Sequence, residues 1–334
     1  MSDPLRRVRL GISGTPRGLA EWVPALRAVR ADVVGVADED LRAARAAARE
    51  LGGEGFTSLQ DLIAAAPGAV LVASGPALLE RIQEAVGAGV SVACVPPLGA
   101  LPEQLESLAR DAEAAGTVAM PALLHRFHPA FAFVADTTLC GDLGPVVQCR
   151  CDRATRADLP LPESPEEAAR VLEAEAGPSL DLCRWWQGEV LSVSADIALG
   201  PRVHGEPFAN LICTHPAGAS VHHLLRRSRR AAPEQYLVEF ASASLSVRCD
   251  VRGECQIILC RRGRRPEEIT SRVPAAPPPK VAFLDHFLDC VQGAGQPKAT
   301  LHDYRRIAEI LVAARISSRD SAKVALPPVH AHAA

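Results

Sequence analysis

Two glycines enclose a short polar turn near the start of the chain, where an apolar run gives way to a helical pattern. The turn consists of Gly14, Thr15, Pro16, Arg17 and Gly18. Glycines at a strand-to-helix turn let the backbone approach a phosphate, and the N-terminus of the following helix attracts negative charge. Pro16 removes one backbone N–H from this turn, whereas Arg17 adds a guanidinium that pairs with phosphate. The spacing therefore predicts a phosphate-binding turn.

An acidic residue ends the next apolar run. Asp38 directly follows residues 32–37, about where dinucleotide-binding domains place a carboxylate on the ribose hydroxyls. A carboxylate there repels the additional phosphate of NADP, so Asp38 favours NAD over NADP. The alternative is that Asp38 only caps the following helix, although Asp40 is the expected N-cap of residues 40–51.

The elements that position these residues follow from the apolar pattern. Short continuous apolar runs alternate with helical patterns, which is typical of a parallel sheet covered on both faces. We expect an α/β chain in which residues 1–121 form a Rossmann-like, doubly wound domain. The expected strands are residues 8–13, 32–37, 69–73, 90–94 and 118–120.

The pattern changes after residue 121, where strands follow one another with few helices between them. We expect residues 122–334 to form an α+β domain with an open, mostly antiparallel sheet. Residues 157–168 read as a proline-rich acidic loop, and Ser179–Trp186 as a short helix. Two closing helices are expected to pack back toward the first domain, over Val281–Val291 and Leu301–Ser317.

Several segments resemble the Gfo/Idh/MocA oxidoreductase family, in wording and in order. They are residues 7–18, 33–52, 69–99, 123–131, 141–146, 181–195 and 325–328. The resemblance implies an NAD(P)-dependent oxidoreductase that acts on a sugar, cyclitol or similar polyol. It also implies a homodimer or homotetramer formed through the C-terminal sheet. At the cofactor, it adds two further segments: Ser74, Gly75 and Pro76, and Val95, Pro96 and Pro97.

The positions that carry proton transfer in that family hold other residues here. The resemblance places the family's lysine at Pro96, and its aspartate and histidine at Ala174 and Pro178. Proline side chains neither donate nor accept a proton. A shift of alignment restores none of these groups, because no lysine precedes residue 280 and no histidine lies between residues 129 and 203.

Two histidines are candidate substitutes for the missing acid–base groups. His125 and His128 lie in the segment that resembles the family's hinge, and imidazole titrates near neutral pH. The alternative is that they only form hydrogen bonds at a domain seam. Candidate substrate-binding residues are Arg126, Asp181, Trp185, His215 and His222. His222 and His223 are expected to point to opposite faces of one strand. Trp185 is more typical of helix packing against the sheet than of a sugar-stacking platform.

The composition narrows the class of partner. The chain has 334 residues, a net charge of -3 and ten cysteines. This charge and the lack of interleaved basic and aromatic residues argue against nucleic acid and membrane partners, and favour a small-molecule ligand. The cysteines form no CxxC pair, so we expect reduced, mostly buried thiols, no metal site and a cytoplasmic protein.

Three functional hypotheses follow. The first is a divergent oxidoreductase of this family, whose proton transfer uses a substitute such as His125 or His128. The second is a non-catalytic paralogue that binds a ligand or a partner. The third is a lyase or isomerase without redox chemistry. Pro16, Pro96 and Pro178 motivate the second and third hypotheses.

Overall fold

The computed structural model describes residues 7–73, 77–153, 162–198, 208–216, 218–224, 234–250 and 253–328. The chain divides into two compact units, and each is described by itself. The first unit comprises Met1–Phe127 and Ala276–Arg305, and the second comprises His128–Ala275 and Arg306–Ala334. The first unit thus includes a segment from near the end of the chain.

The first unit is built on a six-stranded parallel sheet with the order β3-β2-β1-β4-β5-β6. The chain runs outward from β1 in both directions, which is the doubly wound arrangement. Leu10, Ile12 and Leu71 have no exposed surface, as expected for central strands covered on both faces. The strands are β1 (Val8–Ser13), β2 (Ala31–Ala37), β3 (Glu54–Phe56), β4 (Ala69–Val72), β5 (Ser91–Cys94) and β6 (Ala119–Pro121).

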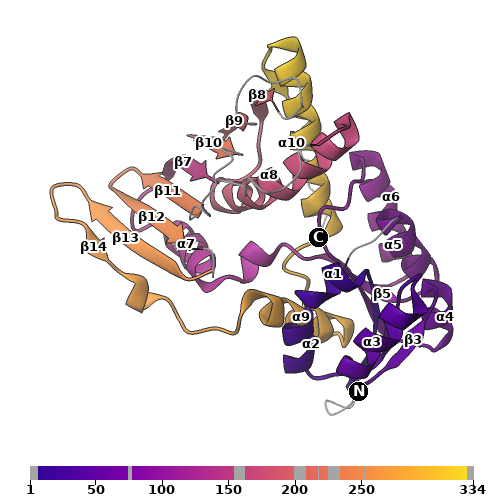
Figure 1. Ribbon diagram of the computed structural model, residues 1–334. Helices are drawn as coiled ribbons and strands as arrows, with labels where there is room; N and C mark the ends of the chain where they lie inside the picture. The colour runs from indigo at the N-terminus through magenta and orange to yellow at the C-terminus, as the bar shows by residue number, and fades with distance from the viewer. Residues whose placement is uncertain are drawn as a thin grey trace. The chain divides into compact units, whose positions relative to one another are not determined.

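Helices cover both faces of this sheet (Figure 1). Helices α1, α2, α3 and α9 pack against one another, and α4, α5 and α6 form a second packed group. Asp40 caps α3 through bonds from Arg42 N and Ala43 N, as the sequence predicts. The helices are α1 (Pro16–Ala20), α2 (Val23–Ala28), α3 (Leu41–Leu51), α4 (Leu59–Ala64), α5 (Leu78–Gly87), α6 (Pro102–Ala114), the 3₁₀ turn η1 (Leu124–Phe127) and α9 (Pro279–Val291).

The second unit is built on a mixed sheet with the order β14-β13-β12-β11-β7-β10-β9-β8-β15. Only the β7–β10 pair is parallel, so the sheet is mostly antiparallel and the predicted α/β fold class is confirmed. The strands are β7 (Val146–Asp152), β8 (Ser192–Ala198), β9 (Phe208–His215), β10 (Gly218–Leu224), β11 (Glu234–Phe240), β12 (Ala243–Cys249), β13 (Cys255–Arg261), β14 (Glu267–Glu268) and β15 (Val324–Ala325).

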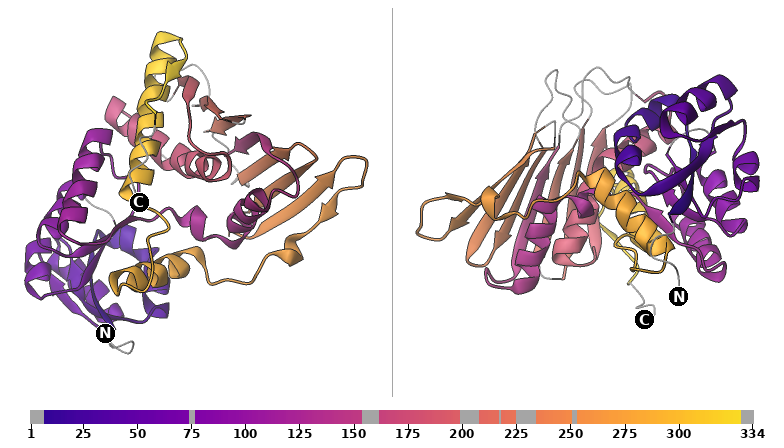
Figure 2. Two further views of the ribbon diagram at one scale, coloured as in Figure 1. Left: turned by 180° about the vertical axis from the view of Figure 1, so that it is seen from behind. Right: turned by 90° about the horizontal axis from the view of Figure 1, so that it is seen from below.

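Helices α7 (Pro129–Cys140) and α8 (Pro165–Gln187) lie side by side on one face of this sheet (Figure 2, right). The turn η2 (Thr270–Arg272) and most of α10 (Leu301–Asp320) complete the second unit. Hydroxyl groups of α10 protect the edge strand β8, because Ser317 and Ser318 accept hydrogen bonds from Ala195 N and Ile197 N.

Helix α8 corrects the prediction of a short helix after an acidic loop. It begins at Pro165, continues through Pro178 and ends at Gln187. Ser164 caps it by accepting a hydrogen bond from Glu167 N at 3.1 Å. Pro178 lacks the N–H of one helical hydrogen bond but does not end the helix, because the flanking turns are buried against the sheet.

Candidate functional site

The predicted phosphate-binding turn lies at the carboxyl edge of the first sheet. Gly14 N donates to Ala37 O at 3.3 Å, which ties the turn after β1 to the end of β2. Thr15 is the N-cap of α1 and its hydroxyl accepts from Gly18 N at 3.4 Å. Pro16 occupies the first helical position, where an N–H has no partner within the helix. Pro16 therefore leaves α1 intact and removes one donor that a phosphate would otherwise meet.

Asp38 lies at the same edge, one residue beyond β2. Its N–H donates to Phe56 O at 3.2 Å, and its Oδ1 accepts from Asp40 N at 2.8 Å. The cap of α3 is Asp40, so the alternative that Asp38 itself caps the helix does not describe the structure. The hydrogen bond to Oδ1 fixes the orientation of the Asp38 side chain. The turn of Gly14 to Gly18 and this carboxylate are together the kind of groups that bind a dinucleotide.

The turn that follows β5 lies at the same carboxyl edge of the first sheet and contains Pro96 and Pro97. Val95 N donates to Val72 O at 3.0 Å, and the Pro96–Pro97 peptide bond is cis. Leu98 N donates to the buried Tyr304 hydroxyl oxygen at 3.3 Å, so α10 holds the turn from its carboxyl side. The predicted cofactor residues Ser74, Gly75 and Pro76 lie outside the described residues.

His125 and Arg126 lie in η1 of the first unit, and both are partly buried. The Arg126 guanidinium forms a paired contact with Asp303, with Nη2 donating to Oδ1 at 3.0 Å and Nη1 to Oδ2 at 3.3 Å. It also donates to Lys298 O at 2.6 Å. These contacts hold η1 against the start of α10. A structural role therefore also explains Arg126, besides the proposed role in binding substrate.

His128 belongs to the second unit and is the N-cap of α7. Its Nδ1 accepts from Ala130 N at 3.2 Å, and its Nε2 lies 2.9 Å from Gly253 O. Because a carbonyl only accepts, Nε2 carries the proton and Nδ1 is the acceptor. Both ring nitrogens therefore hold the backbone, which suits the hydrogen-bonding alternative better than proton transfer.

The remaining predicted substrate residues lie within the second unit, beneath or on α8. Asp181, His215 and His222 are at most 2% exposed. Asp181 pairs with Arg184 Nη1 at 3.6 Å, and Trp185 packs against the apolar core beneath α7 and α8. Burial lowers the pKa of His215, although its bond with Gly188 O opposes that shift.

A buried ion network joins α8 to α10 in the second unit. Arg184 and Arg306, each with a 5% exposed side chain, both donate to Glu189. Arg306 also pairs with Glu309 and donates to Pro327 O at 3.3 Å. Burial would raise the pKa of Glu189, but the two guanidinium groups lower it below its ordinary value. Glu189 thus stays ionised and holds both arginines.

A carboxylate that the sequence analysis did not single out lies on α8, close to Ala174 and Pro178. Glu175 is adjacent to Ala174 and precedes Pro178 by one helical turn. Its Oε2 is 3.9 Å from Arg153 Nη2, and its side chain is 23% exposed. Burial raises the pKa of Glu175, the charge of Arg153 opposes that shift, and Glu234 adds to it. Such a carboxyl is able to hold or release a proton nearer neutral pH than an ordinary one.

The cysteines correct a second prediction. Cys249 and Cys255 form a disulfide across the β12–β13 turn, so the thiols are not all reduced. Their register as opposed residues of a hairpin gives the reason. Cys151, Cys183 and His222 form a second group, with one potential ligand atom of each within 4.8 Å of the others.

The electrostatics of this group differ from those of ordinary buried thiols. Burial would lower the pKa of His222, but Cys183 and Cys213 raise it to about 10. Burial would raise the pKa of Cys183, but its contacts with Cys149, Cys151 and His222 lower it well below its ordinary value. The pKa values of His222 and Cys183 therefore shift in opposite directions, because each group stabilises the charged form of the other.

Known proteins share the fold and part of the sequence. Residues 8–123 match the model of an oxidoreductase family with an NAD-binding Rossmann fold. D-apiose dehydrogenase from Paraburkholderia graminis is 23% identical over 331 residues, covering 91% of this chain and 85% of that protein.

Two solved structures have similar folds over nearly the whole chain. An oxidoreductase from Agrobacterium radiobacter, in complex with NAD+, L-tartaric acid and magnesium, gives a TM-score of 0.82 at 15% identity, covering 96% of this chain and 98% of that chain. The WlbA dehydrogenase from Bordetella pertussis, in complex with NADH and UDP-GlcNAcA, gives 0.78 at 19% identity, covering 97% and 100%. Among the described residues, no helix has the length and apolarity required to cross a membrane.

Proposed function

We propose that the chain is a Gfo/Idh/MocA-type oxidoreductase that oxidises a hydroxyl of a sugar or similar polyol with NAD(P). The match of residues 8–123 to that family's model and the similarity to D-apiose dehydrogenase support this proposal. The first unit is an NAD-binding Rossmann domain. The observation that carries the proposal is the turn of Gly14 to Gly18 beside Asp38, at the carboxyl edge of a doubly wound sheet. The D-apiose dehydrogenase and UDP-sugar-bound relatives support a carbohydrate substrate.

The cofactor residues act mainly through the backbone. Gly14 and Gly18 leave room for the pyrophosphate, Arg17 adds a positive charge, and Asp38 binds the adenosine ribose. Bound NAD(P) supplies the hydride acceptor. Since a carboxylate repels a 2′-phosphate, Asp38 makes NAD the preferred form.

Pro96 and Pro178 occupy the family's proton-transfer positions and cannot transfer a proton. Another side chain must therefore act as the base. Oxidation of an alcohol to a ketone releases the hydroxyl proton, and a neighbouring base must take it. His125 is the first candidate, because it lies in η1 of the first unit, shortly after β6. His128 is the weaker candidate, because both of its nitrogens already bond to backbone groups.

Glu175 is the second candidate for the base. It lies on α8 between the positions of the family's aspartate and histidine, with Arg153 beside it. Its raised pKa brings it closer to the range that suits a general base at neutral pH. Arg153 is fixed by Glu234 Oε1 at 2.8 Å, and so has a second anionic partner when Glu175 is protonated.

The test is reduction of NAD and NADP by a panel of aldoses, polyols and sugar acids. We expect NADH formation with at least one of them. The H125A and E175Q variants test the two candidate bases, and H128N serves as the comparison. The variant that lacks the base should show a kcat lower by at least about 100-fold. Full turnover in both H125A and E175Q would remove both candidates.

A non-catalytic, ligand-binding paralogue is the second candidate function. Pro96 and Pro178 favour it, because they replace both proton-transfer positions in one chain. This alternative predicts that NAD(P) or a sugar raises the melting temperature while no substrate of the panel is turned over.

We also propose that the chain assembles through the face of the second sheet opposite α7 and α8. Val147 on β7 and Ile212 on β9 are 50% and 51% exposed. Ile212 lies between the buried Leu211 and Cys213, and Val147 follows the buried Val146. Large apolar side chains on an uncovered sheet face are typical of a subunit interface. Light scattering after size exclusion should give a dimer or tetramer; a monomer would contradict this arrangement.

A further inference from the structure

The parallel pairing of β7 and β10 brings sulfur and nitrogen ligands together on the covered face of the second sheet. His222 is the register partner of Cys151, and Ser220 is the partner of Cys149. Gly218 makes this pairing possible, because a Cβ there would lie 2.0 Å from Val147 O. Residues two apart on a strand share one face, so Cys149 and Cys151 lie on the same side as His222.

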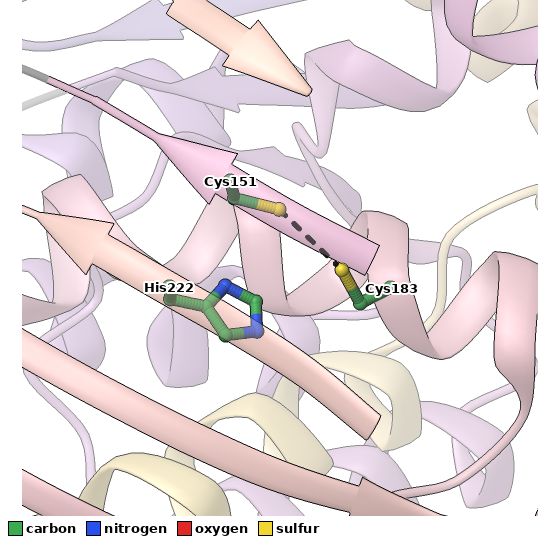
Figure 3. Close-up of side chains that lie close together, drawn as sticks. All are labelled: Cys151, Cys183 and His222. Carbon is green, nitrogen blue, oxygen red and sulfur yellow. Dashed lines mark hydrogen bonds between the residues drawn. The ribbon is translucent and has the colours of Figure 1, made fainter. Parts of the chain in front are cut away.

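Helix α8 contributes a third ligand from above the sheet. Cys183 Sγ is 3.5 Å from Cys151 Sγ. Figure 3 shows the two sulfur atoms and the imidazole ring of His222 converging from two strands and one helix. Cys151, Cys183 and His222 are each at most 1% exposed.

Hydrogen bonds fix the orientation of the His222 ring. Its Nε2 is 2.9 Å from Ser220 Oγ, which is also 2.9 Å from His215 Nε2. His215 Nδ1 lies 2.8 Å from Gly188 O, and because a carbonyl only accepts, that nitrogen carries a proton. A neutral His215 then accepts the Ser220 proton, and Ser220 Oγ accepts one from His222 Nε2.

This order of donors leaves a lone pair on His222 Nδ1. Nδ1 is 3.1 Å from Ser179 Oγ, whose hydroxyl also lies 3.0 Å from Ala176 O and has one proton to donate to either of them. The Cys183 thiol is a second hydrogen-bond partner of the His222 ring. A metal ion on Nδ1 would take the place of these protons and would also be reached by the two adjacent sulfurs.

We propose that Cys151, Cys183 and His222 bind a thiophilic metal ion, for which Zn²⁺ is the favoured ion. Tetrahedral Zn²⁺ with bonds of about 2.3 Å to sulfur and 2.0 Å to nitrogen needs ligand separations of about 3.6 to 3.8 Å. The sulfur pair already has this separation within a few tenths of an ångström, and the potential ligand atom of His222 lies within 4.8 Å of both sulfurs.

The chemistry of the surroundings indicates a structural ion. Two thiolates neutralise the charge of Zn²⁺, which suits a fully buried position. The ligands are at most 1% exposed, which leaves no path for a substrate to reach the ion. The ion would fasten α8 to β7 and β10, and the Ser220–His215 chain would hold the histidine ligand in place. The proposal is independent of the oxidoreductase activity, because none of these ligands belongs to the cofactor edge.

The test is the metal content of the full chain, purified without chelator after growth with added zinc. We expect about one zinc or copper ion per chain by mass spectrometry of the elements, and loss of that ion in C151S and C183S. C140S is the matched control, because Cys140 is an exposed free cysteine on α7 and should leave the metal content unchanged.

Cobalt gives a readout that does not depend on variants folding. Metal-free wild-type chain titrated with Co²⁺ should develop thiolate-to-cobalt absorption that saturates at one equivalent and is displaced by Zn²⁺. Absence of bound metal together with no cobalt spectrum would overturn the proposal. A Cys151–Cys183 disulfide in freshly purified protein, detected by peptide mapping after alkylation, would overturn it as well.

Discussion

The carboxyl edge of the first sheet and the covered face of the second sheet hold their polar groups in opposite ways. At the edge, short turns after β1, β2 and β5 present backbone groups and one carboxylate, so the proposed cofactor site depends on strand ends. On the covered face, side chains from β7, β10 and α8 converge with almost no exposure. Prolines occur in the edge turns, at Pro16 and Pro96, without disrupting the adjacent strands. On the covered face of the second sheet, in contrast, each buried polar side chain needs a specific hydrogen-bond or ion-pair partner.

The largest expected effect follows from removing the shared anion of the second unit. Glu189→Ala leaves Arg184 and Arg306 buried with one fewer carboxylate each, although other partners remain. We expect a loss of about 2 to 3 kcal/mol in the free energy of unfolding, measured with urea. Glu21→Ala is the control, since the 76% exposed Glu21 side chain pairs with Lys280 and should contribute below about 1 kcal/mol. Equal effects of the two changes would contradict the contrast.

Pro96→Lys tests whether the edge has lost only its proton-transfer group. Because the turn is held by Val72 O and Tyr304, a lysine there should place its ammonium at the edge of the sheet. We expect kcat with an active polyol to rise by about 10-fold or more. Pro96→Arg is the matched control, because a guanidinium brings the charge without releasing a proton near neutral pH. Identical rates in both variants would argue against lost proton transfer.

Tyr304→Phe tests how firmly the edge is held from α10. Removing the hydroxyl takes an acceptor from the buried Leu98 N–H. We expect about 1 kcal/mol less stability and a weaker affinity for NAD, measured by urea unfolding and by titration. An unchanged affinity alongside reduced stability would show that the proline turn contributes little to cofactor binding.

The smallest expected effect is the contribution of His215 to the pH dependence of the free energy of unfolding. Since burial lowers its pKa in the folded state, the unfolded state binds more protons, and stability should fall as pH decreases below about 6.5. His215→Asn should flatten the urea midpoint between about pH 5.5 and 7.5. A variant with the same slope as the wild type would show that His215 does not contribute to it.

The sequence predicts the first unit better than the second for a physical reason. Central parallel strands are continuous apolar runs, so β1, β2, β4 and β5 are evident from the pattern alone. Only the last turns of helix α8 were predicted, as Ser179–Trp186, because residues 157–168 read as a proline-rich acidic loop. The signal that could have located its start is Ser164 followed by Pro165 and, at the third position, Glu167.

The buried site could not be predicted because its members meet only through tertiary pairing. Cys183 is 32 residues from Cys151, and no local spacing marks the two as neighbours. Their meeting with His222 depends on the parallel register of β7 and β10, which the apolar pattern does not specify. The exposed edge is different, because each of its residues directly follows a strand.

Cofactor binding is tested most directly by calorimetric titration of the full chain with NAD and with NADP, repeated on Asp38→Ala. We expect one site per chain with a Kd below about 1 mM, tighter binding of NAD than of NADP, and loss of that preference in the variant. Absence of binding by either nucleotide up to about 5 mM, with no rise in melting temperature, would contradict the oxidoreductase assignment.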